Sequence, residues 1–472
     1  MIKIESKKNK FTYNVYHVTK AFYPKEDIVQ TVDEKQEPLV KIHLPEGTCF
    51  SLAPEECVQT EDVQEEKRDV TKKVYQFLSK QTGQELAWGM LTGVRPTKLV
   101  MQKIEQGMTK EEIFEFLKEQ YCVGDKKAQI AYEIACREKA LLDQLDCKNG
   151  YSLYAGIPFC PSISFSSSPI AEWKDQVDRY LDAMIKELKT TAKLMQGKPL
   201  DTVYIGGGTP TTLEADQLDR LLGTIRENFD LEHVLEFTVE AGRQDSITRE
   251  KLEVIRKYPV TRISVNPQTM QQKTLDLVGR KHTVEDVEQI FHLARELGFD
   301  NINMDLIAGL PGEDAADMQD TLEKIEKLHP DSLTVHALAI KRAAKFGQEG
   351  RTMDPGTEIT QMVEAAAASA ERMGLVPYYL YRQKNIAGNF ENVGYAEQDK
   401  AGVYNILIME ERQTIIACGA GSTTKLVLPE KIKTSSGKET NLIRVENVKN
   451  ITEYIARIDE MIERKEALFE KD

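Results

Sequence analysis

Residues 202–240 read TVYIGGGTPTTLEADQLDRLLGTIRENFDLEHVLEFTVE, and this stretch contains one complete strand–helix–strand pattern. A short run rich in β-branched and aromatic residues leads into three glycines, and a second such run ends at Glu240. The longer segment between the two runs has helical character. A strand, a crossover helix and a second strand of this kind form a parallel βαβ unit.

The same alternation recurs along the chain from Tyr151 to Ala339. Its other apolar runs are YSLYAGI (151–157), TRISVN (261–266), NINMDLI (301–307) and DSLTVHALA (331–339). Six strands with intervening helices predict a parallel sheet. No dinucleotide fingerprint follows the first strand, which favours an incomplete barrel over a Rossmann sheet. We therefore predict an α/β protein built on a partial (β/α)6 barrel.

The regions before and after this strand–helix alternation have a different sequence pattern. Residues 1–150 open with short β-like runs and continue with helical patterns around WGMLTGVRPTKL (88–99). After about Leu375 an aromatic and Asn-rich stretch, a Gly-rich loop and a terminal helical pattern follow. The sequence thus predicts an N-terminal α/β accessory domain (1–150), the partial barrel (151–375) and a C-terminal α+β extension (376–472).

Composition excludes several classes of protein. Of the 472 residues 41% are hydrophobic and 29% charged, which is typical of a globular chain. No run approaches the roughly 18–20 apolar residues that span a bilayer, and MIKIESKKNK lacks a signal-peptide core, so we expect a cytoplasmic protein. A net charge of −14 disfavours a nucleic-acid partner. Seven dispersed cysteines indicate reduced thiols, and none has the spacing of a zinc site.

In a parallel barrel the chemistry collects at the carboxyl ends of the strands. Taken singly, each residue that follows a predicted strand is typical of a turn, a surface ion pair or a buried packing position. Taken together they suit an amino-acid nucleoside, because glycine amides approach a ligand closely, carboxylates accept from hydroxyl or amino groups, and arginine pairs with a carboxylate. These candidates are Cys160, Gly207, Gly208, Thr209, Glu240, Gln268, Arg280 and Asp305.

These residues resemble the radical S-adenosylmethionine (SAM) enzymes of the oxygen-independent coproporphyrinogen III oxidase group. The resemblance rests on YAGIPFC (154–160), GGGTP (206–210), the strand ending at Glu240 and DLIAGLPG (305–312). WGMLTGVRPTKL and YRQKNIAGNFENVGYA (381–396) resemble the HemZ-type branch in particular.

The resemblance implies where the cofactors would bind. Tyr154, Gly207 and Glu240 would contact the SAM molecule that chelates a [4Fe-4S] cluster, and Cys160 would be a cluster ligand. A second SAM molecule, which the coproporphyrinogen enzymes bind, would be lined by Gly208, Thr209, Gln268, Arg280, Asp305 and the backbone of Ala339.

The chain departs from the family in its cluster motif. The family pattern is Cys-x3-Cys-x2-Cys, but here Cys160 is followed by PSISFSSSPI. Either Ser164 and Ser167 replace two cysteines, or four residues of the form Cys-x-x-Cys are missing between Ile163 and Ser164. We prefer the deletion, because relatives of this branch continue after the third cysteine with a stretch like the present SFSSSP.

The chain cannot supply three local thiolates in either case, and Cys49, Cys57 and Cys418 are remote in sequence. A [4Fe-4S] cluster requires thiolate ligands, and a serine alkoxide is a poor substitute. We therefore predict little or no cluster and no SAM cleavage.

The resemblance implies the oxidative decarboxylation of two propionates of coproporphyrinogen III to vinyl groups, in haem biosynthesis. The partners would be a porphyrinogen or haem and an unidentified electron donor and acceptor, and we expect a monomer. Lys341, Arg342 and Arg382 are candidate partners for the substrate carboxylates. Two alternatives stay open, namely a haem-binding chaperone of the same superfamily and a catalytically silent SAM-binding protein.

Overall fold

The computed structural model describes the whole chain except residues 36, 162–167, 339–354, 383–390, 435–438 and 470–472. It divides into two compact units. One comprises Met1–Arg137, Ala337–Thr360 and Leu380–Asn392, and the other Glu138–His336, Gln361–Tyr379 and Val393–Asp472. The predicted site residue Ala339, like Lys341 and Arg342, lies outside the described residues. The three domain boundaries set from composition stay a prediction.

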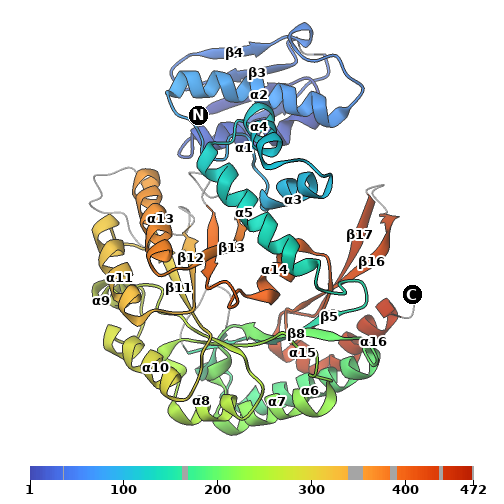
Figure 1. Ribbon diagram of the computed structural model, residues 1–472. Helices are drawn as coiled ribbons and strands as arrows, with labels where there is room; N and C mark the ends of the chain where they lie inside the picture. Colours follow the sequence, from blue (N-terminus) through green and yellow to red (C-terminus); the bar gives the residue numbers. More distant parts are fainter. Residues whose placement is uncertain (36, 162–167, 339–354, 383–390, 435–438, 470–472) are drawn as a thin grey trace. The chain divides into compact units, whose positions relative to one another are not determined.

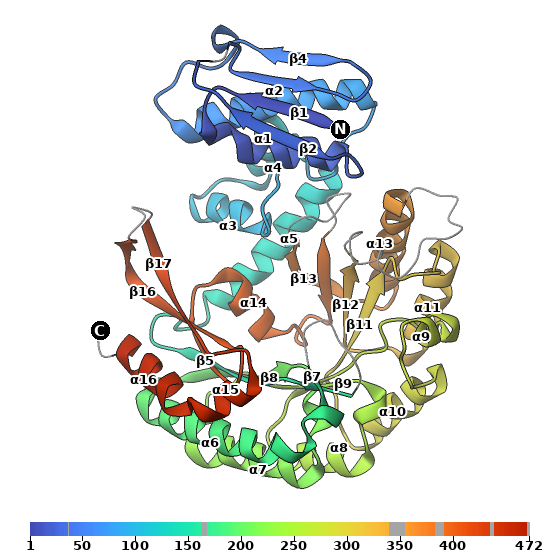
Figure 2. The same cartoon turned by 180° about the vertical axis from the view of Figure 1, so that it is seen from behind.

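The first unit begins with a four-stranded sheet in the order β2-β1-β3-β4 (Figures 1 and 2). Strands β1 and β2 pair in parallel, and the other two pairs are antiparallel. Apolar residues of β1, α1 and α2 form one core, which includes Ile4, Phe11, Val15 and Val74. The elements of this unit are β1 (Ile2–Ser6), α1 (Asn9–Phe22), β2 (Ile28–Val32), β3 (Val40–His43), β4 (Cys49–Leu52), α2 (Val63–Thr82), α3 (Thr97–Glu105), α4 (Lys110–Tyr121) and most of α5 (Asp125–Leu142).

Two motifs that the sequence singled out meet inside this unit. The indole N–H of buried Trp88 donates to Glu391 Oε2 over 2.8 Å, and Lys127 forms an ion pair with the same carboxylate. Arg382 donates from Nη1 to the carbonyl of Leu91, and burial lowers the pKa of its guanidinium to about 10. Both motifs thus serve at least to fasten distant segments of chain to one another.

The second unit contains an eleven-stranded sheet in the order β13-β14-β12-β11-β10-β9-β8-β5-β15-β16-β17. Neighbouring strands from β5 through β11 pair in parallel. The barrel-like strands are β5 (Tyr151–Ile157), β8 (Leu200–Gly207), β9 (Glu236–Gly242), β10 (Arg262–Val265), β11 (Ile302–Ala308) and β12 (Ser332–Ala337). The prediction of an α/β fold with a partial barrel is confirmed, and within the described residues the sheet does not close into a barrel.

Helices line the outer face of this curved sheet (Figure 2). They are α6 (Val177–Leu194), α7 (Ala215–Asn228), α8 (Arg249–Arg256), α10 (Val284–Glu296) and α11 (Ala315–Leu328). Side chains alternate between the two faces of a strand. On β8 and β9 the apolar residues Val203, Ile205 and Val239 are fully buried, whereas the intervening Tyr204 and Glu240 are polar. The inner face is therefore polar and the helix-covered face apolar.

Strands of the C-terminal segment join the same sheet. β14 pairs antiparallel with β12, and β15 pairs in parallel with β5 on the side away from β8. Helix α14 contacts β8, and Figure 1 shows it on the inner side of the curved sheet. The remaining elements are α9 (Gln272–Leu277), α13 (Pro355–Arg372), β13 (Val376–Tyr381), β14 (Asn392–Ala396), α14 (Val403–Glu410), β15 (Thr414–Cys418), β16 (Thr423–Lys433), β17 (Glu439–Glu446), α15 (Ile451–Ala456) and α16 (Ile458–Phe469).

Among the described helices, none combines the length and the apolar character that crossing a bilayer demands.

Candidate functional site

Four of the predicted residues lie on or just after four adjacent strands, β8 to β11. Gly207 ends β8, Glu240 lies near the end of β9, Gln268 follows β10, and Asp305 lies in β11. The backbone N–H of Gln268 donates to the carbonyl of Asp305 over 2.9 Å, which joins the last two directly. The parallel sheet thus gathers residues from distant parts of the chain at one edge, as a ligand site requires.

The three glycines pack closely against the end of β5. Gly207 has φ +105°, and a Cβ there would lie 3.0 Å from the carbonyl oxygen of Ile157 and 3.2 Å from the Tyr154 hydroxyl. A Cβ on Gly208 would come within 2.2 Å of the Phe159 carbonyl oxygen. The backbone N–H of Gly208 donates to Ile157, and that of Thr209 donates to Phe159. Contact of a ligand with buried Thr209 would therefore use its side chain.

Glu240 is enclosed by groups from β8. The Tyr204 hydroxyl donates to Glu240 Oε1, and a Cβ on Gly206 would lie 2.7 Å from Glu240 Oε2. Burial raises the pKa of Glu240 to about 7, and the charge of Asp305 adds to the rise, although the bonds from Tyr204 and the Gly207 amide oppose it. Glu240 therefore titrates near neutral pH and ionises fully where a cation approaches it.

A stack of three tyrosines lies beside Glu240. The rings of Tyr204 and Tyr404 are 4.4 Å apart at 22°, and Tyr154 stands 6.2 Å from each. Tyr404 comes from α14, which contacts β8. Sequence reasoning missed Tyr204 and Tyr404. A polar residue at every second position of an apolar strand could have indicated Tyr204, whereas nothing near Tyr404 in the sequence points to the barrel.

Asp305 has a different environment. Asn303 Nδ2 donates to its Oδ1 over 2.7 Å, and His336 Nε2 lies 3.8 Å from its Oδ2. Burial alone would raise the pKa of Asp305, but bonds from His336, Asn303 and Thr334 outweigh burial and hold this pKa below its ordinary value. Two carboxyl groups at one edge thus differ, with Asp305 ionised and Glu240 poised to exchange a proton. Sequence reasoning did not single out His336.

Gln268 and Arg280 occupy the loop region after β10. Gln268 has φ +66°, a left-handed conformation that is strained for a residue other than glycine. Two backbone hydrogen bonds to β11 hold Gln268 in this conformation. Its N–H donates to the carbonyl of Asp305, and its carbonyl accepts from the N–H of Ile307. Arg280 follows α9, and no described residue forms an ion pair with its guanidinium.

The residues present do not fit a [4Fe-4S] cluster. Cys160 is buried at the end of β6 (Phe159–Cys160), and the sequence between Cys160 and Ser168 contains no further cysteine. Among the described residues no group of three His, Cys, Asp or Glu could hold a metal ion. Such a cluster needs three thiolates in the motif, so one cysteine is too few.

Cys418 does not make up the missing ligands. Its strand, β15, lies directly beside β5, with Cys418 in register with Ala155, so this cysteine is nearer in space than its sequence position suggests. Its Sγ, however, lies 3.4 Å from Thr191 Oγ1 on α6 and 3.7 Å from Lys465 Nζ on α16. Burial raises the pKa of this thiol to about 12. Cys418 thus packs under the helices as a thiol.

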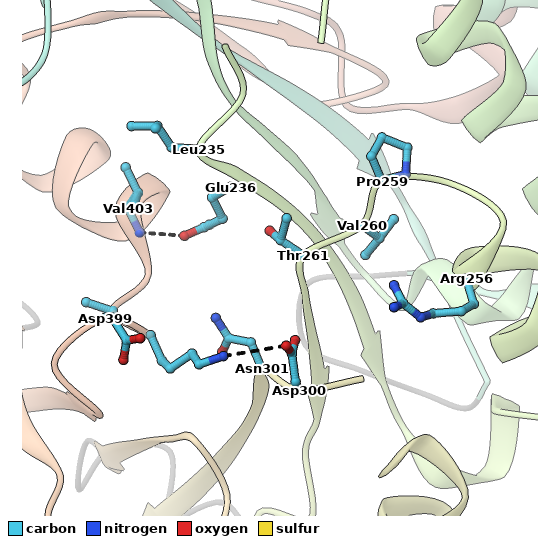
Figure 3. Close-up of a pocket in the computed structure, with 12 residues that line it drawn as sticks. Leu235, Glu236, Arg256, Pro259, Val260, Thr261, Asp300, Asn301, Asp399 and Val403 are labelled. Atoms are coloured by element: carbon cyan, nitrogen blue, oxygen red, sulfur yellow. Dashed lines mark hydrogen bonds and ion pairs between the residues drawn. The ribbon is translucent and has the colours of Figure 1, made fainter. Parts of the chain in front are cut away.

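A cavity of 440 Å³ lies at the opposite ends of the same strands (Figure 3). Glu236, Thr261 and Asn301 line it just where β9, β10 and β11 begin. Glu236 accepts a hydrogen bond from the backbone N–H of Val403. Lys400 forms an ion pair with Asp300, with 3.8 Å between Nζ and Oδ2. Because the predicted site residues lie at the carboxyl ends, this cavity is separate from them.

Comparisons with known proteins agree with this architecture. Residues 158–325 match the Radical SAM superfamily. The chain is 41% identical to the oxygen-independent coproporphyrinogen-III oxidase-like protein HemZ of Bacillus subtilis over 421 residues, which cover 86% of this chain and 82% of that protein. It is 33% identical to the heme chaperone HemW of Bacillus subtilis, over 48% of this chain and 62% of the relative.

A solved structure shows the same fold. Coproporphyrinogen III oxidase (HemN) from Escherichia coli superposes with a TM-score of 0.53 at 22% identity, covering 66% of this chain and 70% of the other. The extent and identity of the match to HemZ go beyond the fold. The chain therefore belongs to the radical SAM superfamily, in the group of oxygen-independent coproporphyrinogen III oxidase-like proteins of the HemZ type.

Proposed function

We propose that this chain binds SAM at the edge formed by Gly207, Glu240, Gln268 and Asp305, and that it does not cleave SAM while its cluster motif has one cysteine. The observation that carries the proposal is the pair of unlike carboxyl groups on β9 and β11, the strands on either side of β10, near Gly207, where a Cβ would meet Ile157 and Tyr154. For the form with a complete motif we propose the oxidative decarboxylation of coproporphyrinogen III propionates.

The residues present fit an amino-acid nucleoside. Glu240 would hold the cationic amino group, because its carboxylate ionises fully against a positive charge. Asp305, already ionised, would accept hydrogen bonds from ribose hydroxyls. The absence of a side chain at Gly207 lets the end of β8 pack against Ile157 and Tyr154, and the tyrosine stack would exclude water from one side of the ligand. SAM supplies a sulfonium centre whose cleavage needs a reduced cluster.

Calorimetric titration with SAM tests this proposal. Wild-type protein is expected to bind SAM, and Asp305→Ala to bind it about 10- to 100-fold more weakly, because a charged acceptor for two hydroxyls is lost. Asp300→Ala is the matched control, since this carboxylate is 86% exposed and lies at the amino end of β11. The absence of SAM affinity in the wild-type protein would end the proposal.

The affinity for SAM is expected to rise with pH up to about 7. The pKa of Glu240 is raised to about 7, so below that pH the carboxyl is protonated and SAM must displace the proton. Affinity should fall about tenfold per pH unit below 7 and level off above it. The side chains that influence the pKa of Glu240 are Tyr204, Asp305 and Arg262, and the substitution of Glu240 described next leaves all three unchanged. In Glu240→Gln the titrating group is gone, and the profile should be flat from about pH 5.5 to about pH 7.5. A flat wild-type profile would contradict this role.

Haem carriage is the second candidate function. The match to the heme chaperone HemW covers 48% of the chain, whereas the match to the Escherichia coli oxygen-independent coproporphyrinogen III oxidase, also 33% identical, covers 39%. Titration with haem separates the two functions. A stable stoichiometric haem complex, formed by the chain with a complete motif and without porphyrinogen conversion, would favour the chaperone.

A further inference from the structure

A line of side-chain hydrogen bonds leads from β10 through β12 to Asp305 on β11. Arg262 Nη2 donates to Ser332 Oγ over 3.0 Å, and Ser332 Oγ donates to Asn303 Oδ1 over 3.1 Å. Asn303 Nδ2 in turn donates to Asp305 Oδ1 over 2.7 Å. Because β10, β11 and β12 are neighbours in the sheet, these four residues form one connected group, which we call the Asp305 network.

The direction of each bond in the Asp305 network follows from its first member. A guanidinium has donors only, so the Ser332 hydroxyl accepts from Arg262 and directs its own proton to Asn303. The Thr334 hydroxyl also donates to Asn303 Oδ1, over 3.1 Å. With two donors on its oxygen, the amide of Asn303 turns its nitrogen toward Asp305. The reversed amide would set its oxygen against the carboxylate, where two acceptors repel each other.

The Asp305 network is sealed at one end and open at the other. Arg262, Ser332 and Asn303 are 2%, 0% and 4% exposed, whereas the side chain of Asp305 is 25% exposed. Burial would lower the pKa of the Arg262 guanidinium, but the charges of neighbouring acidic groups outweigh burial and hold this pKa above its ordinary value. The network thus begins at a fixed buried cation and ends at a carboxylate that a ligand can reach.

We propose that Asn303 is a positioning residue, held by Arg262 and Ser332 in the orientation that keeps the Asp305 carboxylate ionised and aimed at the ribose of the bound nucleoside. This inference rests on the proposed function for its ligand, and it adds three side chains that act on the ligand through Asp305. Hydrogen bonds to an ionised acceptor are stronger than those between neutral groups, so a misplaced or protonated Asp305 would bind the ribose hydroxyls more weakly.

Two variants interrupt the Asp305 network at different places. Asn303→Ala removes the donor to Asp305, and Ser332→Ala removes a group that orients the amide while leaving the amide itself. Thermal unfolding of each variant shows that it is folded before its binding is compared.

The sheet contains a second network that serves as a matched control. Ser152 Oγ on β5 accepts from the Thr202 hydroxyl over 2.8 Å and donates to Gln413 Oε1 over 2.9 Å, and Gln413 Nε2 donates to Asp201. Ser152 is 0% exposed, like Ser332. Asp201 lies near the amino end of β8, away from the candidate site. Ser152→Ala therefore removes a hydroxyl of the same kind and burial without touching Asp305.

The first measurement is calorimetric titration with S-adenosylhomocysteine, which keeps the ribose and the amino-acid part of SAM, and with its 2′,3′-dideoxy analogue. The wild-type protein should bind the ribose ligand about 10- to 100-fold more tightly than the analogue. Asn303→Ala should reduce this preference to about twofold, and Ser332→Ala should reduce it to an intermediate value. Ser152→Ala should leave it unchanged. A merely structural role would weaken both ligands equally and preserve the preference.

The second measurement needs no ligand. Infrared difference spectra against Asp305→Asn identify the carboxyl band of Asp305 and show its protonation as the pH is lowered. Asn303→Ala and Ser332→Ala should raise the pKa of Asp305, because donors to its ionised form are lost or misdirected, whereas Ser152→Ala should not. The charged and titratable neighbours that act on Asp305 come from five other strands and are unchanged in all three variants. They are Tyr204, Glu240, Arg262, His336 and Tyr378.

The two measurements separate failure of this inference from failure of the proposed function. A preserved ribose preference together with an unchanged pKa of Asp305 in both variants would overturn the positioning role and leave SAM binding standing. A wild-type protein that binds neither ligand would reject SAM binding. In that case a raised pKa of Asp305 in both variants would still support its control by Asn303, and an unchanged pKa would overturn that control as well.

Discussion

Anaerobic reconstitution with ferrous iron and sulfide is expected to leave this chain without a [4Fe-4S] cluster, whereas inserting Cys-Ser-Ser-Cys between Ile163 and Ser164 should load about four iron atoms per chain. The inserted residues recreate Cys-x3-Cys-x2-Cys from Cys160 onward. Three thiolates then stand where one stands now, and thiolate ligation decides whether such a cluster assembles.

The structure explains why an insertion at this place should be tolerated. β6 and β7 (Ser168–Pro169) pair in parallel, with Phe159 opposite Ser168 and Cys160 opposite Pro169, and the N–H of Ser168 donates to Pro158 over 2.9 Å. The ends of the intervening segment are thus already held together. Lengthening such a closed segment by four residues costs little, since even doubling a loop costs only about 0.6 kcal/mol.

Iron content, acid-labile sulfide and the visible absorption of the cluster are the measurements. The matched control is Ser-Ser-Ser-Ser at the same place, which adds the same length without thiolates and should bind no cluster. Cys160→Ala in the Cys-Ser-Ser-Cys form should lower the iron content again. A normal cluster spectrum with production of 5′-deoxyadenosine from the sequence as it stands would refute the prediction.

The strands and their functional ends could be predicted from the sequence because both follow from local patterns. The run YSLYAGI is β5 itself, and the runs at 202–206 and 301–307 fall within a residue or two of β8 and β11. Parallel strands place their carboxyl ends at one edge, which is why Gly207, Glu240 and Asp305 were expected together.

What escaped prediction depends on contacts between distant segments. Tyr404 reaches the site because α14 packs against β8, and β15 joins the sheet beside β5 although more than half the chain separates them. The left-handed conformation of Gln268 is imposed by its bonds to β11. No local propensity encodes these arrangements, because each arises from packing that forms only in the folded chain.

Removing one member of a buried ion pair under the sheet should destabilise the second unit strongly. Lys465 Nζ lies 2.6 Å from Glu187 Oε1, and the two side chains are 2% and 0% exposed. Lys465→Met is expected to lower the free energy of unfolding by about 3–5 kcal/mol, because it leaves the Glu187 carboxylate buried without its cation.

Changing both partners should recover part of this loss. Glu187→Leu combined with Lys465→Met removes both charges, so no uncompensated carboxylate remains. The recovery is expected to be incomplete, since Glu187 also accepts bonds from the Gly419 N–H (2.9 Å) and from Asn447 Nδ2 (2.7 Å). The Gly419 N–H would then lose its acceptor, whereas Asn447 Nδ2 keeps the Gly419 carbonyl.

The chain provides its own control for this prediction. Lys186 and Asp459 form an ion pair between the same helices, α6 and α16, but are 53% and 71% exposed. Lys186→Met should lower the free energy of unfolding by only about 0–1 kcal/mol. Denaturant unfolding followed by the fluorescence of Trp173, in a Trp88→Phe background, reports on the second unit alone.

Loss of the ion pair between Glu187 and Lys465 is expected to affect the candidate site through the loop after β15. Glu187 holds the amide of Gly419, and a Cβ on Gly419 would lie 2.4 Å from the carbonyl oxygen of Gly156, two residues beyond Tyr154 on β5. The loop thus packs directly on the strand that leads to Cys160. Loss of SAM affinity in Lys465→Met, restored in part by the double variant, is the result we expect. If Lys465→Met and Lys186→Met lower the free energy of unfolding by equal amounts, burial of the ion pair is not what stabilises the second unit.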